Sequence, residues 1–112
     1  MALPTGSGSE ILGNIGGTST SAATHTILTV PALHIYTILS IVISRNGSTA
    51  NIISLHARDS ADRTLVFQQS LSNNSFVWND KLVLMPANIL KLECSAGSET
   101  DYWISYIDQD WT

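Results

Sequence analysis

The sequence predicts an all-β fold: a single β-sandwich or jelly-roll-like domain of about seven or eight antiparallel strands with an extended N-terminal arm. Three observations predict it. Apolar residues alternate with polar ones in short segments, turn-forming residues separate these segments at regular intervals, and no segment has the periodicity of an amphipathic helix. The length of 112 residues is enough for one domain with one hydrophobic core.

Residues 1–23 differ in composition from the rest of the chain. They hold five of the seven glycines, with serines and threonines between them. Because glycine and serine cost much entropy to order and bury little surface, we expect this segment to be an arm outside the domain. The chain then divides into the arm and a β-sandwich domain, residues 24–112. The arm's aliphatic residues Ile11, Leu12 and Ile15 are candidates for contacts with a neighbouring subunit.

The first strand of the domain is expected at residues 24–30, and the longest strand follows at residues 35–44. Large apolar residues lie on both faces of the longest strand, with Tyr36, Ile38 and Val42 on the second face. A strand that is apolar on both faces belongs in the middle of a sheet, with each face covered. We therefore expect the arm or a neighbouring subunit to cover the second face.

Turn residues divide the remaining chain. Asn46-Gly47 is the strongest hairpin signal, since both residues tolerate positive φ. Polar clusters separate the later apolar segments, and Pro86 ends one of them. The expected strands are residues 50–58, 64–71, 76–78, 81–84, 89–95 and 102–107.

No group of residues has the spacing of a catalytic, cofactor-binding or metal-binding site. His25, His34 and His56 lie far apart in the sequence and offer no local set of ligands for zinc. Cys94 is the only cysteine, and its alternating apolar segment predicts a buried side chain rather than a reactive thiol. The N-terminal glycines are not followed by the Lys-Ser or Lys-Thr pair of a phosphate-binding loop. We expect a protein that is not an enzyme and that binds no cofactor.

Charged residues make up only 12% of the chain and hydrophobic residues 44%, with a net charge of −4. The five basic residues are scattered, and nucleic-acid binding needs clustered Lys and Arg, so no nucleic-acid partner is expected. No apolar segment is long enough to cross a membrane, and the N-terminus lacks the pattern of a signal peptide. So few charges predict that apolar side chains lie in subunit contacts, that Ser, Thr and Asn cover the surface, or both. We expect a homo-oligomer, with a trimer favoured.

The aromatic residues gather toward the C-terminus. Trp103 lies within an expected strand, where such a side chain is usually part of the core. Trp111 follows the last expected strand, and we expect it to dock onto a neighbouring subunit, with a glycan as the second choice. The candidate interface residues are therefore Ile11, Leu12, Ile15, Tyr36, Ile38, Val42 and Trp111.

The pattern of strands and turns from residue 24 to about residue 108 resembles that of the small β-sandwich virion proteins of tailed bacteriophages. The resemblance is carried by Thr29-Val30-Pro31-Ala32, by Leu82-Val83-Leu84-Met85-Pro86-Ala87-Asn88-Ile89-Leu90 and by Ser105-Tyr106. At two turns the chain departs from the pattern: it has Leu33-His34 and Ala87-Asn88 where many relatives carry glycine.

The resemblance implies a virion structural protein without catalytic residues. We expect a capsid decoration (cement) subunit that stabilises the particle and contacts other virion proteins, such as the major capsid protein. Its expected location is the virion, after assembly in the host cytoplasm. One alternative is a head–tail connector or tail component. Another is a carbohydrate- or receptor-binding module, which needs a concave face with an exposed tryptophan and paired Asn or Asp. A small β-sandwich enzyme would instead show turnover that a single Ser, His or Asp substitution abolishes.

Overall fold

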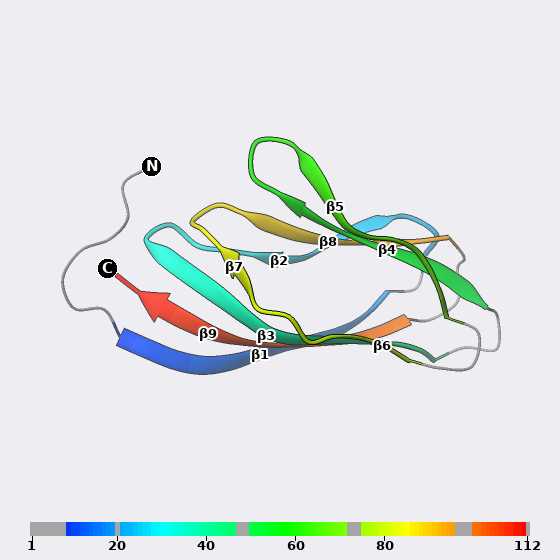
Figure 1. Cartoon of the computed structure of the whole chain (residues 1–112), viewed down its shortest axis with the longest axis horizontal. Helices are drawn as coiled ribbons and strands as arrows, with labels where there is room; N and C mark the ends of the chain where they lie inside the picture. The colour runs from blue at the N-terminus through cyan, green and yellow to red at the C-terminus, as the bar shows by residue number, and fades with distance from the viewer. Residues whose placement is uncertain (1–8, 20, 47–49, 72–74, 96–99, 112) are drawn as a thin grey trace.

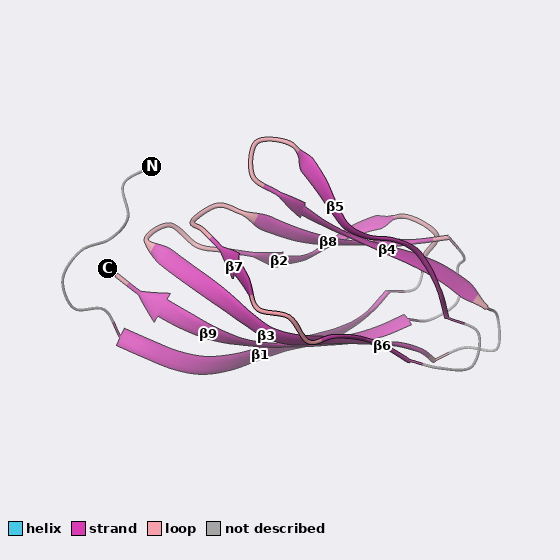
Figure 2. Cartoon of the chain, viewed as in Figure 1, coloured by secondary structure: helices cyan, strands magenta, loops and turns pink. Residues whose placement is uncertain are grey.

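The structure is a computed structural model that describes residues 9–19, 21–46, 50–71, 75–95 and 100–111. These residues form nine β-strands and no helix, so the described part of the chain has no helix that could cross a membrane (Figure 2). The strands are β1 (Ser9–Ser19), β2 (Thr24–Thr29), β3 (His34–Arg45), β4 (Asn51–Arg58), β5 (Asp62–Leu71), β6 (Ser75–Trp78), β7 (Leu82–Leu84), β8 (Ile89–Cys94) and β9 (Thr100–Asp110).

The strands form two sheets that pack face to face (Figure 1). Sheet A has the order β1-β9-β3-β6, with β7 also pairing with β3, and sheet B has the order β2-β8-β4-β5. All seven pairs of described strands are antiparallel. Five of them are nested: β4 with β5 innermost, then β3 with β6 and β7, then β2 with β8, and β1 with β9 outermost. The other two pairs, β3 with β9 and β4 with β8, join these hairpins into the two sheets. This nesting is the connectivity of a jelly roll. The all-β sandwich prediction is confirmed, and each of the eight strands expected after residue 23 is present.

The hydrophobic core lies between the two sheets. It is built from alternate residues of the inner strands, because successive side chains of a strand point to opposite faces. In sheet A the core includes Ile41 and Ile104, and in sheet B it includes Leu55 and Leu92, all fully buried. Burying one such side chain stabilises the fold by about 1.5–3 kcal/mol. Cys94 is also buried, as its position in an apolar alternation predicted.

A bulge in β3 corrects the expected division of its side chains between two faces. Against β9, Ile38 pairs with Tyr106 and Ser40 pairs with Ser105, so Leu39 is an extra residue in β3. An extra residue reverses the alternation beyond it. Side chains on both sides of the bulge, from Tyr36 and Ile38 to Ile43, therefore reach the same core. Tyr36 and Ile38 of the expected second face thus lie in the core, whereas Val42 remains exposed on the outer face of sheet A. That an arm or a neighbouring subunit covers Val42 stays a prediction.

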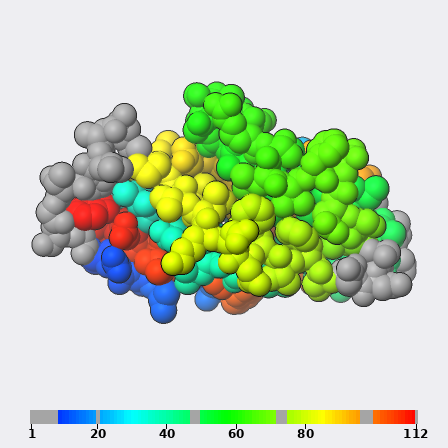
Figure 3. Space-filling view, in the orientation of Figure 1, coloured from blue at the N-terminus to red at the C-terminus, as the bar shows by residue number. Residues whose placement is uncertain are grey.

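The sandwich also includes part of the segment that the sequence assigned to an arm. Residues 9–19 form β1, an edge strand of sheet A that pairs with β9 along its whole length, from Ser9 opposite Asp110 to Ser19 opposite Thr100. In the space-filling view β1 is visible only at the lower rim of the molecule (Figure 3). The described part of the domain thus begins at Ser9, and the expected boundary after residue 23 is corrected. Residues 1–8 of the expected arm lie outside the described residues.

The glycines of residues 9–19 suggested an arm, but their lack of side chains is what lets β1 pair with β9 beneath the aromatic rings of β9. Gly13 lies opposite Tyr106 and Gly17 lies opposite Tyr102. A Cβ atom added to Gly13 would lie 2.7 Å from Tyr106 Cζ, and one added to Gly17 would lie 2.5 Å from Tyr102 Oη. Aromatic rings of β9 therefore occupy the space above the β1 backbone that side chains of β1 would otherwise fill.

The two turns where the chain departs from the phage virion pattern that it resembles have left-handed backbone conformations. Leu33 has φ 63° and Ala87 has φ 70°. In each turn the next residue donates its backbone N–H to the carbonyl three residues earlier, His34 to Pro31 and Asn88 to Met85. Positive φ at the third turn position is the pattern of a type II turn, which favours glycine there. The glycine expected at these turns thus has a physical reason, and this chain adopts the conformation without it.

Candidate interaction surfaces

The face of sheet A that points away from sheet B is the largest surface with an unusual composition. Directly paired residues on this outer face form rows across the strands, and apolar rows alternate with polar ones. The tryptophan row consists of Gly16, Trp103, Val42 and Val77, and the leucine row consists of Leu12, Ile107, Thr37 and Val83. The polar row beyond the tryptophan row consists of Thr18, Asp101, Ser44 and Ser75.

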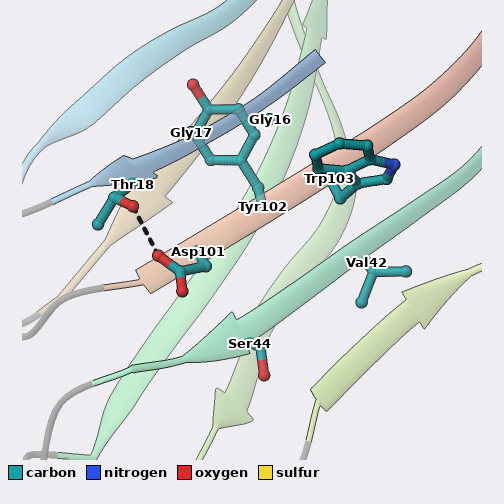
Figure 4. A pocket seen from close by; sticks show the side chains of 8 residues that line it. All are labelled: Gly16, Gly17, Thr18, Val42, Ser44, Asp101, Tyr102 and Trp103. Atoms are coloured by element: carbon teal, nitrogen blue, oxygen red, sulfur yellow. Dashed lines mark hydrogen bonds between the residues drawn. The ribbon is translucent and has the colours of Figure 1, made fainter. Parts of the chain in front are cut away.

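The outer face is hollowed where the tryptophan row meets this polar row. The hollow has a volume of about 410 Å³ and opens to solvent (Figure 4). Trp103 lines its apolar side and is 52% exposed. On the polar side the Thr18 hydroxyl donates a hydrogen bond of 2.6 Å to Asp101 Oδ1 (Figure 4). The Ser44 hydroxyl, also at the hollow, is hydrogen-bonded to that of Ser75 at 2.8 Å.

The start of β1 is a second exposed apolar region. Ile11 and Leu12 are adjacent, point to opposite faces of sheet A, and are 60% and 74% exposed. β1 pairs only with β9, so its other edge presents backbone N–H and C=O groups to the surroundings. An edge strand of this kind is a site where another chain can pair unless charges, prolines or bulges oppose it. Glu10 is the only charged residue in β1, and β1 has neither a proline nor a register shift.

A cluster of titratable side chains lies where β3 begins and β9 ends. His34 Nδ1 lies 2.7 Å from Asp108 Oδ1, and His34 Nε2 lies 3.5 Å from Asp110 Oδ1. Tyr36 stacks on Tyr106 with ring centroids 4.5 Å apart. Burial, together with the neighbouring Tyr106 and Asp108, raises the pKa of Tyr36 to about 12. The cluster ties β3 to β9 at the end of sheet A where β1 begins and β9 ends (Figure 1).

On sheet B, His56 bridges three strands. Its Nδ1 lies 3.1 Å from the Thr64 hydroxyl and its Nε2 lies 2.9 Å from Glu93 Oε1. A hydroxyl, an imidazole and a carboxylate in this order are the parts of a hydrolase triad. The small hollow nearby is lined by Glu93 but by neither His56 nor Thr64. The three residues therefore cross-link β5, β4 and β8 on an open surface.

The seven candidate interface residues are divided between the core and the surface. Tyr36 and Ile38 lie in the core of their own subunit because of the bulge, which corrects their assignment to an interface. Ile15 is half-buried and packs against the core. Ile11, Leu12 and Val42 are exposed, Val42 in the tryptophan row. Their role in subunit contacts stays a prediction.

The two C-terminal tryptophans are placed differently from what the sequence suggested. Trp103 is on the outer face of sheet A, so its expected core position is corrected: Tyr102 and Ile104 beside it are the residues that face the core. Trp111 is half-buried by its own chain, and its backbone N–H donates a hydrogen bond of 2.9 Å to the Leu33 carbonyl. Its indole Nε1 is buried without a hydrogen-bond partner. Docking of Trp111 onto another subunit stays a prediction.

Sequence reasoning missed the hollow beside Trp103. Its residues come from three strands, and Thr18 and Asp101 are far apart in the sequence. Trp103, next to Tyr102 in a strand whose faces were not assigned, was the one local signal. Within the described ranges no cluster of three or more His, Cys, Asp or Glu is arranged to hold a metal ion.

No protein-family model matches the sequence, and no curated protein matches it. Solved structures do show similarity. A subunit of the disulfide-linked pili that form Bacillus endospore appendages has a TM-score of 0.57 at 14% identity, over 100% of this chain and 97% of that one. The virus-like particle of Macrobrachium rosenbergii extra small virus gives 0.56 at 10% identity, over 98% and 84%. Infectious bursal disease virus strain Gx gives 0.56 at 11% identity, over 92% of this chain but 33% of that one. The chain shares its jelly-roll fold with proteins of virus particles and of a pilus.

Proposed function

We propose that this chain is a non-enzymatic structural subunit of a virion and, more specifically, a capsid decoration subunit of a tailed phage. The observation that carries the proposal is the exposed apolar start of the edge strand β1. Ile11 and Leu12 are both more than half exposed, in a chain with few charged residues, and the strand lacks the features that prevent edge pairing. Such a strand favours contact with a second subunit.

The fold supports the same class of function. Proteins of the two virus particles described above are similar to this chain in structure, each with a TM-score of 0.56, and the resemblance of residues 24–108 to phage virion proteins points in the same direction. The proposed partners are other copies of this chain, as a trimer, and the major capsid protein. The proposed location is the virion. A head–tail connector or tail component uses the same surfaces and remains the alternative within this class.

The subunit contact can be tested by sedimentation velocity of the purified protein. Ile11→Ser with Leu12→Ser should convert a multimer into a monomer and leave the thermal midpoint of that monomer nearly unchanged. Ile52→Ser is the matched control, because Ile52 is 45% exposed on sheet B. If the double variant sediments like the wild type, the start of β1 is not the contact.

The finer proposal can be tested by cryo-electron microscopy of purified virions that contain the chain. We expect density for it on the outer surface of the capsid, at threefold positions. Density at the neck or tail would replace the decoration role by the alternative.

A filament subunit is a second candidate, because the pilus subunit matches almost the whole of both chains. That pilus is linked by disulfides. Here the single cysteine, Cys94, is buried with its Sγ 3.6 Å from the Ser19 hydroxyl, so a linkage of that kind would need the core to open. Filaments in negative-stain images of the purified protein would favour this candidate.

A further inference from the structure

We propose that the hollow beside Trp103 on the outer face of sheet A is a binding site for a neutral carbohydrate. The inference goes beyond the proposed structural role and does not depend on it. Its occupant is a short, uncharged oligosaccharide whose apolar C–H face lies on the indole of Trp103 and whose hydroxyls reach Asp101, Thr18 and Ser44.

The indole of Trp103 is held in a fixed position over β1. Trp103 lies opposite Gly16, and a Cβ atom added to Gly16 would lie 2.6 Å from Cε3 and 2.8 Å from Cζ3 of the ring. The ring therefore lies over the backbone of β1 instead of standing in solvent, with half of its surface exposed. The β1 backbone and Val42 hold an aromatic platform in place before a ligand arrives, which lowers the entropy cost of binding. A sugar ring has an apolar face that fits such a platform.

The Asp101 carboxylate, at the edge of this aromatic platform, has unused capacity to accept hydrogen bonds. Asp101 accepts one hydrogen bond at Oδ1, from Thr18, and its Oδ2 has no partner among the described residues. A carboxylate accepts several hydrogen bonds, and sugar hydroxyls are donors that can supply them. The hollow, at about 410 Å³, is within the range of small-ligand sites. An exposed tryptophan, one carboxylate and two hydroxyls thus meet in one depression.

The charges on the outer face favour a sugar over a second copy of the chain as the occupant of the hollow. The rows of the outer face contain the carboxylates of Glu10 and Asp101 but neither Lys nor Arg in the described residues. If two copies met through this face, Asp101 would be buried without a cation, at a cost of several kcal/mol. A neutral polyol satisfies the carboxylate without that cost. The same absence of cations disfavours sialylated, sulfated and nucleic-acid ligands.

The site can be tested on the full chain by ¹⁵N-NMR titration with maltotriose, cellotriose, mannotriose and chitotriose, after a glycan array has surveyed neutral and acidic glycans. We expect saturable binding of at least one neutral glycan, with shifts centred on the Trp103 indole N–H and the amides of Asp101 and Val42. Acidic glycans should not bind.

Two variants and one control separate the outcomes. Trp103→Ala should weaken binding by about tenfold or more, and Asp101→Asn by a smaller factor. Val83→Ala, on the same face but in the leucine row, should bind like the wild type. Circular dichroism confirms that each variant is folded. The proposal is overturned by the absence of saturable binding on the array and in the titrations, by equal binding of Trp103→Ala, or by Trp103→Ala reducing self-association in sedimentation and leaving glycan binding unchanged.

Discussion

The outer surface of sheet B carries ion pairs beside the exposed Ile52 and Phe67, whereas that of sheet A is apolar and nearly free of ionic groups. On sheet B, Asp62 pairs with Arg58 at 3.2 Å and with Lys91 at 3.3 Å, and His56 pairs with Glu93. On sheet A the outer rows alternate between aliphatic or aromatic side chains and small polar ones. Both sheets bury apolar residues on their inner faces, so the core does not require this difference. The proposals above assign contacts with partners and ligands to sheet A and its β1 edge, and the difference between the sheets can be tested.

The largest test of the comparison is to remove β1. Deletion of residues 1–19 should unfold the domain or lower its free energy of unfolding by about 5 kcal/mol, because β9 loses its partner strand and Tyr102 and Tyr106 lose their cover. Urea unfolding followed by fluorescence measures the loss. A synthetic peptide of residues 9–19 added to the truncated chain should restore part of it. An unchanged unfolding midpoint would restore the arm boundary at residue 23.

Two neighbours on β9 test the two faces of sheet A. Ile104→Ala should lower the free energy of unfolding by about 2–5 kcal/mol, because Ile104 is fully buried and the change leaves a cavity. Trp103→Ala should cost about 1 kcal/mol or less, because half of the indole is exposed and no cavity forms. Chemical denaturation of both variants makes the comparison. Equal losses would mean that the outer face is packed in the isolated subunit.

Alkaline pH should lower the stability of the fold through the buried Tyr36 of sheet A but not through the exposed acids of sheet B. Because the pKa of Tyr36 is raised to about 12, against about 10 when unfolded, its contribution is fully present below pH 10 and is lost as the pH rises toward 12. The loss should reach about 2–3 kcal/mol, and Tyr36→Phe should remove this part of the alkaline dependence. Denaturation at pH 9, 10, 11 and 12 measures it. The same slope in both proteins would contradict the raised pKa.

The acids of sheet B give stability a pH dependence of the opposite sign. Two backbone N–H donors, from Ala61 and Ser60, lower the pKa of Asp59, and hydrogen bonds from Arg58 and Lys91 lower that of Asp62. Their contribution is present above the ordinary aspartate pKa and is lost as the pH falls through the lowered values. Since both carboxylates are exposed, water screens these interactions.

One of the turns that join the sheets offers a gain in stability. Ala87→Gly should raise the free energy of unfolding by about 1 kcal/mol, because glycine adopts the positive φ of this turn without strain. Ala57→Gly, in β4, is the control and should lower it by about 0.5–1 kcal/mol. Thermal unfolding of the two variants should shift in opposite directions. A lower midpoint for Ala87→Gly would show that the methyl group contributes more than the strain costs.

The smallest effect is expected on sheet B. Asp62→Ala removes the ion pairs with Arg58 and Lys91, but exposed pairs contribute little and are screened by salt. Its unfolding midpoint should lie close to that of the wild type, and any difference should vanish as the salt concentration rises. A loss comparable to that of Ile104→Ala would mean that the sheet B surface is as important for stability as the core.

The eight strands after residue 23 could be predicted because alternation and turn residues are local signals. Besides the core position of Trp103, two expectations were wrong, and both depended on interactions that are not local. β1 has glycines where a strand usually has side chains, and the rings that replace those side chains come from Tyr106 and Tyr102. The bulge at Leu39 depends on its pairing with β9, so a strict two-residue period placed Tyr36 and Ile38 on the wrong face. The hollow could not be predicted for the same reason, because its residues are brought together only by the register of β1 and β3 against β9.

The nested pairing of the strands also has a consequence for how the chain closes during synthesis. β4 and β5 are separated by three residues, so their hairpin can form within microseconds, whereas Glu10 and Gln109 on β1 and β9 are 99 residues apart. At about 5–20 residues per second, β1 leaves the ribosome several seconds before its partner exists. A valine- or isoleucine-rich strand that stays unpaired for that long would be prone to aggregate. Gly13, Gly16 and Gly17 carry no side chains, so the unpaired β1 segment exposes less apolar surface. It gains its packing only after β9 has been synthesised and its aromatic rings can cover the glycines.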